Sequence, residues 1–116
     1  MVRPSQLVVR DDLLSLSARQ LIRVDTPAWF AWLEQATSFS YRPARSSYRL
    51  SFRKEKRRHQ SYWYAYLKED GKLHNAYVGC SPALTAARLR AVTQQLVDKA
   101  RLARPAVGPE GGKLMP

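Results

Sequence analysis

An Asp-Gly pair, Asp70-Gly71, separates two segments whose residues favour extended backbone. The segment before it, 62–68, is rich in aromatic residues, and the segment after it, 73–79, ends at a glycine. Asp-Gly is typical of the two-residue turn that joins antiparallel strands, because both residues tolerate the positive φ that such a turn needs. This region therefore predicts an antiparallel hairpin, which limits the fold classes open to the chain.

A second hairpin is predicted from 38–42 and 47–54, joined across 43–46. Apolar and polar residues alternate in 47–54, so one face of this strand is apolar and the other carries Arg49 and Arg53. Nearer the N-terminus, three short apolar runs predict a small meander of strands, and they are 7–10, 13–16 and 21–24.

Two helices complete the predicted fold. Asp25-Thr26-Pro27 is typical of a helix start, and that helix runs to about Ala36 with its apolar face on Trp29, Trp32 and Leu33. A longer helix follows Thr85 and ends near Leu102, with its apolar stripe on Leu89, Val92, Leu96 and Ala100.

These elements predict an α+β fold in a single domain over residues 1–104. Its sheet is small and antiparallel, with three core strands plus the N-terminal strands. The long C-terminal helix packs on one face, and the short helix lies near residues 27–36. The Pro/Gly-rich segment 105–116 predicts a disordered tail.

The composition narrows the choice of partner. The formal net charge of +11 favours a polyanion, with duplex DNA first and RNA second. An anionic membrane surface is disfavoured, because the basic residues do not follow one amphipathic helix. A single cysteine, Cys80, excludes an internal disulfide, and no apolar run is long enough for a membrane span or a signal peptide. We expect a cytoplasmic, nucleoid-associated protein.

No set of residues predicts an active site. His59 and His74 have no cysteine or carboxylate at ligand spacing, and Cys80 has no histidine near it in the sequence. We therefore expect a nonenzymatic protein without a metal, a cofactor or a small-molecule substrate.

The positive charge is concentrated in one block that leads into the aromatic strand. Residues 42–58 contain eight Lys or Arg and one Glu, so they carry +7 of the net charge of +11. Cations beside exposed aromatic rings are typical of nucleic-acid interfaces. The alternative is that the charges form only a solvated face or loop and that the aromatic rings belong to the core.

Strand alternation divides the aromatic block between two faces. If the long helix covers Leu50 and Phe52, the same buried face takes Trp63, Ala65, Leu67, Ala76 and Val78. The opposite assignment exposes Trp63 and buries the tyrosines. It is less favourable because it also buries Lys68 and Asn75.

The exposed face and the basic run together form the predicted binding site. Arginine can bond to guanine edges or phosphates, asparagine to adenine, and the tyrosine hydroxyl to phosphate. We expect 54–58 to lie in a loop and to contact phosphates. The predicted nucleic-acid-binding residues are Arg45, Arg49, Arg53, Lys54, Lys56, Arg57, Arg58, Tyr64, Tyr66, Lys68, Asn75 and Tyr77.

The chain also resembles the N-terminal extension of some large LuxR-type ATP-binding bacterial regulators. The resemblance covers roughly residues 24–102, and its most specific motif is Tyr62-Trp63-Tyr64-Ala65-Tyr66. The other matching segments are Pro27-Ala28-Trp29-Phe30-Ala31-Trp32-Leu33, Ser38-Phe39-Ser40-Tyr41, Arg53-Lys54-Glu55-Lys56-Arg57, Ala76-Tyr77-Val78-Gly79, Leu84-Thr85 and Arg88-Leu89. Where those regulators have basic residues around the third strand, this chain has Asn75-Ala76 and Cys80.

More loosely, the sheet-plus-helix pattern is similar to the arm-site DNA-binding domains of tyrosine recombinases and to the plant ethylene-response-factor domain. Those domains read DNA with an open sheet face. The resemblances imply a bacterial setting in transcription regulation or in a mobile element.

Three functions remain open on the sequence. The leading hypothesis is a nonenzymatic module that binds duplex DNA. The second is an RNA-binding subunit of a ribonucleoprotein complex, which uses the same surface. The third is a protein-interaction module of a larger regulatory assembly, which the density of charge on the Arg49 face disfavours.

Overall fold

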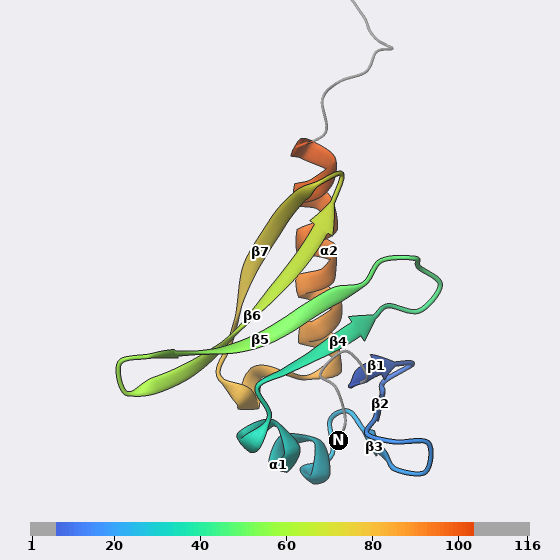
Figure 1. Ribbon diagram of the computed structural model, residues 1–116, viewed down its shortest axis with the longest axis vertical. Coiled ribbons are helices and arrows are strands. Elements are labelled where there is room, and N and C mark those ends of the chain that lie inside the picture. Colours follow the sequence, from blue (N-terminus) through green and yellow to red (C-terminus); the bar gives the residue numbers. More distant parts are fainter. Residues whose placement is uncertain (1–6, 104–116) are drawn as a thin grey trace, which may run out of the picture.

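The computed structural model describes residues 7–103, which form a mixed sheet with helices packed against it (Figure 1). The helical elements in the described part of the chain are α1 Pro27–Gln35, the short 3₁₀ turn η2 Ser81–Ala83 and α2 Ala86–Ala103. The strands are β1 Val8–Arg10, β2 Leu13–Ser15, β3 Leu21–Arg23, β4 Ser38–Arg42, β5 Leu50–Arg57, β6 Gln60–Glu69 and β7 Lys72–Gly79. The predicted α+β class is confirmed.

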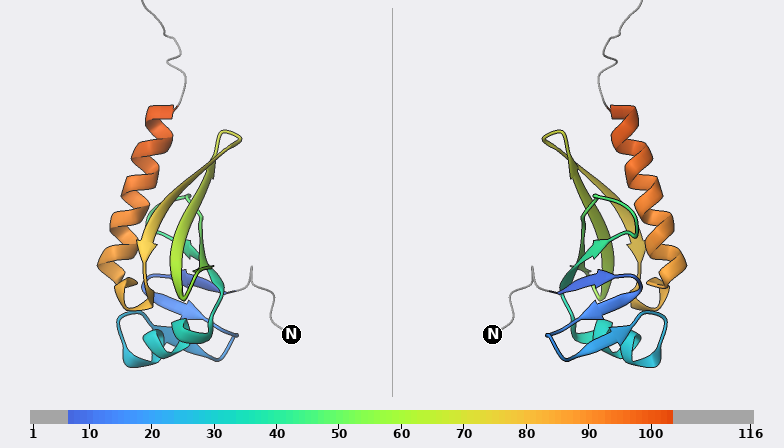
Figure 2. Two further views of the ribbon diagram at one scale, coloured as in Figure 1. Left: turned by 90° about the vertical axis from the view of Figure 1, so that its left-hand side faces the viewer. Right: turned by 90° about the vertical axis from the view of Figure 1, so that its right-hand side faces the viewer.

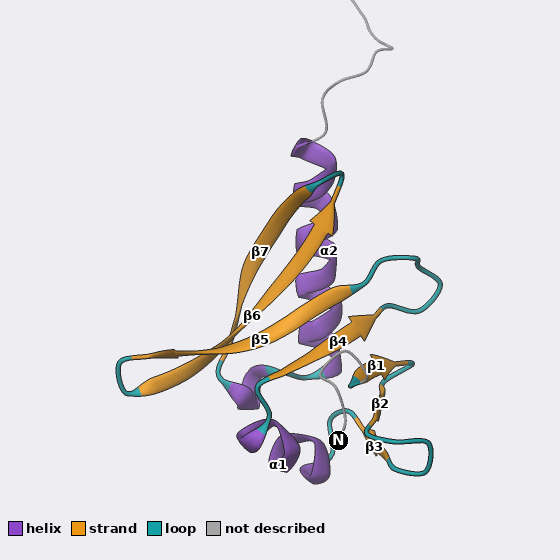
Figure 3. Ribbon diagram, viewed as in Figure 1, coloured by secondary structure: helices purple, strands orange, loops and turns teal. Residues whose placement is uncertain are grey.

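The sheet is larger than predicted and is not purely antiparallel. Its seven described strands lie in the order β3-β2-β1-β4-β5-β6-β7 (Figure 3). β1 pairs in parallel with β4, in the register Val8↔Ser40, and this pairing joins the N-terminal meander to the hairpins. The expectation of a small antiparallel sheet was wrong here, because a parallel pairing between segments about 30 residues apart leaves no local pattern in the sequence.

The β6–β7 hairpin forms at the expected turn. Asp70 and Gly71 both have positive φ, at 51° and 78°, as a two-residue turn between twisted strands requires. Asp11 and Asp12, which join β1 to β2, have φ of 53° and 61° and turn the chain in the same way.

β5 differs most from its prediction. It begins at Leu50 rather than at residue 47, and it continues to Arg57, which pairs with Gln60. Only Arg58 and His59 remain in the turn. The expectation that 54–58 is a loop was wrong, because pairing with β6 outweighs the weak strand preference of charged residues whose side chains remain exposed or half-buried.

One apolar cluster lies between the sheet and the helices. Phe39 stacks on Phe52 with their ring centroids 4.9 Å apart, and Trp29 packs edge-on against Phe39 at 5.4 Å. The buried indole groups also have hydrogen-bond acceptors. Trp29 donates its Nε1 proton to the Leu84 carbonyl at 2.7 Å, and Trp63 donates to Ser81 Oγ at 3.0 Å.

Both helices begin at the predicted caps. Thr26 accepts a hydrogen bond from the Trp29 amide at 3.3 Å, and Thr85 accepts one from the Arg88 amide at 3.1 Å. The predicted stripe of α2 is buried: Leu89, Val92, Leu96 and Ala100. Figure 2 shows α2 running along β7, so that it covers one face of the sheet at this end.

Two further predictions concern the C-terminal tail and a membrane span. The predicted disordered tail, 105–116, lies outside the described residues. Among residues 7–103, neither helix combines the length and the apolar character needed to cross a bilayer.

Candidate nucleic-acid interface

The two faces of β5, β6 and β7 carry the side chains that strand alternation predicted for them. Trp63 and Ala65 have no exposed surface, and Leu67, Ala76 and Val78 are 6% exposed or less. Arg53, which alternates with buried neighbours on β5, is exposed. The opposite assignment, with Trp63 outside and the tyrosines in the core, is therefore excluded.

We use the name open face for the side chains of β5–β7 that alternate with these buried residues. Most are exposed or half-buried, and they lie on the side of the sheet away from α2. They are Ser51, Arg53, Glu55, Arg57, Gln60, Tyr62, Tyr64, Tyr66, Lys68, Leu73, Asn75 and Tyr77. Arg49, one residue before β5, is exposed at the border of this face.

Rings and guanidinium groups pack on one another across the open face. The Arg53 guanidinium carbon lies 5.7 Å from the centre of the Tyr66 ring, and that of Arg57 lies 5.5 Å from the Tyr64 ring. Tyr77, which is 50% exposed, meets the Tyr64 ring edge-on at 5.6 Å. These cation–π contacts hold the two arginines over the sheet rather than leaving them free in solvent.

Tyr62 extends the aromatic row toward the end of the β5–β6 hairpin. Its ring lies 5.9 Å from that of Tyr77, and its hydroxyl donates to Gln60 Oε1 at 2.6 Å. The predicted site omitted Tyr62, although it shares the strand parity of Tyr64 and Tyr66.

Glu55 is the acidic group within the open face, and the predicted site omitted it as well. Arg57 donates to Glu55 Oε1 at 3.0 Å, and the Tyr66 hydroxyl donates to Glu55 Oε2. The hydrogen bond to the carboxylate raises the pKa of Tyr66, with burial and the Glu55 charge adding to the effect. Strand parity with Arg53 places Glu55 on this face, so the sequence did contain the signal.

Lys54 lies on the opposite face of β5. Its ammonium group donates to the Leu33 carbonyl at 2.6 Å and to the Glu34 carbonyl at 3.0 Å, and it lies 5.4 Å from the Trp63 ring. A cation is favourable at the C-terminal end of α1, where carbonyl groups lack partners within the helix. This contact gives Lys54 a structural role, and its predicted phosphate contact stays a prediction.

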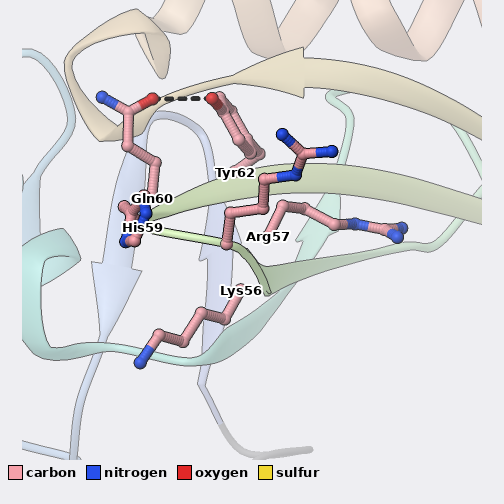
Figure 4. Close-up of a pocket in the computed structure, with 6 residues that line it drawn as sticks. Lys56, Arg57, His59, Gln60 and Tyr62 are labelled. Carbon is pink, nitrogen blue, oxygen red and sulfur yellow. Dashed lines mark hydrogen bonds between the residues drawn. The ribbon is translucent and has the colours of Figure 1, made fainter.

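The remaining cations of the basic run surround the end of the β5–β6 hairpin. Lys56, Arg57 and Arg58 line a shallow hollow there with His59 and Gln60 (Figure 4). At the other end of β5, Arg45 and Arg49 belong to the exposed loop that connects β4 to β5. The predicted site residues are therefore spread along β5 and its two ends.

Two cations of α2, Arg88 and Lys99, donate hydrogen bonds to the backbone of β7. β7 is an edge strand, and Arg88 donates from Nε to the Val78 carbonyl at 3.1 Å and from Nη2 to the Tyr77 carbonyl at 3.2 Å. Lys99 donates to the Asn75 carbonyl at 3.0 Å. These bonds occupy backbone acceptors of β7 and so protect this edge from pairing with another strand.

Among residues 7–103, no three His, Cys, Asp or Glu side chains come together in a way that could hold a metal ion. The open face combines cations, phenol groups and the Glu55 carboxylate. The chain matches no family model, no curated protein and no solved structure in the three comparisons made. The resemblance to LuxR-type regulators thus stays a prediction, and the function is inferred from the geometry of the open face.

Proposed function

We propose that the chain is a nonenzymatic module that binds duplex DNA with the open face. The observation that carries this proposal is the segregation of charge and aromatic groups. Arg53, Arg57, Lys68 and four tyrosines share one side of β5–β7, and α2 covers the other side. A two- or three-stranded sheet fits the major groove, where arginine can bond to guanine and tyrosine to phosphate.

The packing of the rings favours a duplex over a single strand. Single-strand binding proteins present free ring faces on which bases stack. Here the Arg53 and Arg57 guanidinium groups lie over the rings of Tyr66 and Tyr64, and both rings are only partly exposed. The groups that this surface presents to solvent are hydrogen-bond donors and ring edges, which can contact phosphates and the edges of paired bases.

The exposed positive charge also supports duplex DNA as the partner. Six exposed cations on the open face and at the ends of β5 can reach phosphates: Arg49, Arg53, Lys56, Arg57, Arg58 and Lys68. Arg57 among them is paired with Glu55 in the free protein. If all six reached phosphates, the logarithm of the binding constant would fall with the logarithm of salt concentration with a slope of roughly −5.

The test is a titration of wild-type and Arg53→Ala protein with duplex DNA, single-stranded DNA and duplex RNA at several salt concentrations. Arg53→Ala should weaken duplex-DNA binding by about tenfold or more and leave the melting temperature nearly unchanged, because Arg53 is exposed. Arg101→Ala, an equal charge change on the exposed side of α2, is the matched control.

Equal losses in Arg53→Ala and Arg101→Ala would contradict a specific role for the open face. Tighter binding to duplex RNA than to duplex DNA would favour the ribonucleoprotein alternative, since only a 2′-hydroxyl preference separates the two. Binding to no nucleic acid would leave the protein-interaction alternative.

A further inference from the structure

The β5–β6 hairpin extends past both of its neighbouring strands. β4 pairs with β5 only as far as Ser38↔Arg53, and β7 pairs with β6 only as far as Trp63↔Gly79. Beyond these points the pairs Glu55↔Tyr62, Lys56↔Ser61 and Arg57↔Gln60 form a two-stranded ribbon. We call residues 55–62 the ribbon, and Figure 1 shows it projecting from the body of the protein.

The ribbon carries Lys56 on one face, an Arg57–Glu55 ion pair on the other face and exposed basic residues at its tip. Alternation places Lys56 and Arg57 on opposite faces, and Figure 4 shows their side chains leaving the strand in different directions. Arg58 and His59 form the turn and are exposed. In the part of the chain that the structure describes, no carboxylate forms an ion pair with Lys56 or Arg58.

The backbone at the tip is unusual for the residue it carries. Arg58 has a φ of 57°, in the left-handed region that favours Gly, Asn or Asp. The other non-glycine residues with positive φ in residues 7–103 are Asp11, Asp12, Asp25, Asp70 and Arg45. An arginine at a turn position that local preference would give to glycine or asparagine indicates a use for the guanidinium group outside the fold.

We propose that the end of the ribbon, through Lys56 and Arg58, is an arm that grips duplex DNA next to the stretch covered by the open face. The open face shares only Glu55, Arg57, Gln60 and Tyr62 with the ribbon. This inference rests on the proposed function of the open face. Three residue pairs and the turn span about 13 Å, which corresponds to about four base pairs of duplex. A two-stranded ribbon fits the major groove, where Lys56 on one face and Arg58 at the tip can reach phosphates.

An arm of this kind makes affinity depend on duplex length. On a duplex of about 20 base pairs, wild-type protein uses the open face and the ribbon, whereas a duplex of about 8 base pairs has room for only one of them. Losing two phosphate contacts should make the salt slope less steep by about 2 on the long duplex.

The experiment compares the double variant Lys56→Gln/Arg58→Asn with wild type on both duplexes. Asparagine is chosen because it removes the charge yet tolerates the left-handed backbone. The double variant should bind the long duplex about tenfold more weakly and the short duplex within about twofold of wild type. Lys72→Gln, at the tip of the β6–β7 hairpin, is the control, and it should behave as wild type on both.

Arg53→Ala separates this inference from the proposed function, because it should weaken binding to both duplexes. If Arg53→Ala does so while the double variant binds the long duplex like wild type, or loses equally on both lengths, the arm is overturned and the open face stands. If Arg53→Ala has no effect, the proposed function fails. A drop in the melting temperature of Arg58→Asn below that of wild type would contradict the strained tip.

Discussion

The two hairpins that share β6 follow local sequence rules to different degrees. The β6–β7 hairpin turns at Asp70-Gly71, which suits positive φ at both positions, and α2 lies along β7 with Lys99 bonded to the Asn75 carbonyl. The ribbon turns at Arg58, which does not suit positive φ, and no other strand pairs with it in residues 7–103.

This difference separates residues that stabilise the fold from residues whose role lies outside the fold. Where the turn chemistry, the strand preference and the packing agree, stability alone explains the sequence. At the ribbon, the charged residues Lys56, Arg57 and Arg58 have weak strand preference, and the tip residue opposes its backbone conformation. Departures of this kind are expected at functional sites.

The largest expected effect tests where the core ends and the ribbon begins. Trp63→Ala should lower the free energy of unfolding by about 3 to 5 kcal/mol, because the indole is fully buried and bonded to Ser81. Tyr62→Ala, one residue closer to the tip, should cost about 1 kcal/mol, because that ring is only half-buried. Denaturant titration of both variants measures the contrast, and equal losses would mean that the ribbon is part of the core.

A smaller effect compares the two turns directly. Gly71→Ala should destabilise the fold by about 1 kcal/mol through its φ of 78° alone, because a Cβ there meets nothing within 4 Å. Arg58→Asn should leave the free energy of unfolding unchanged or raise it by up to about 1 kcal/mol. Thermal unfolding provides the measurement. If Arg58→Asn destabilised as much as Gly71→Ala, the contrast between the turns would be lost.

The smallest effect concerns Glu55 at the base of the ribbon and its bond from Tyr66. The folded state raises the pKa of Tyr66 above its ordinary value of 10.0, chiefly through this bond. Its contribution to stability is therefore complete below pH 10 and is lost as the pH rises through the raised pKa.

Glu55→Gln should lower the Tyr66 pKa, because a neutral acceptor holds the phenol proton less strongly than a carboxylate does. Tyrosinate absorbance followed against pH detects the change. The Tyr66→Phe background serves as the control, and there Glu55→Gln should leave the titration as it was. A titration that Glu55→Gln does not alter in the wild-type background would show that the two side chains are not bonded in solution.

Local sequence patterns predicted much of this fold and the division of strand side chains between the two faces of the sheet. Period-two alternation in 47–54 and 62–68 decided that Trp63 is buried and that Arg53 and Tyr64 are not, since each step along a strand reverses the side chain. The Asp70-Gly71 turn and the caps Thr26 and Thr85 were equally readable, because they depend on residues adjacent in the chain.

Only the tertiary structure decided what depends on distant segments. The parallel pairing of β1 with β4 makes the sheet mixed, and pairing with β6 continues β5 to Arg57. Lys54 lies in the middle of the basic run, yet its ammonium binds carbonyls of α1, because the fold places that helix end beneath β5. The sequence by itself determined which side chains share a face, and the fold determined which charges on the chain are free, because a charge is paired only by what folding brings beside it.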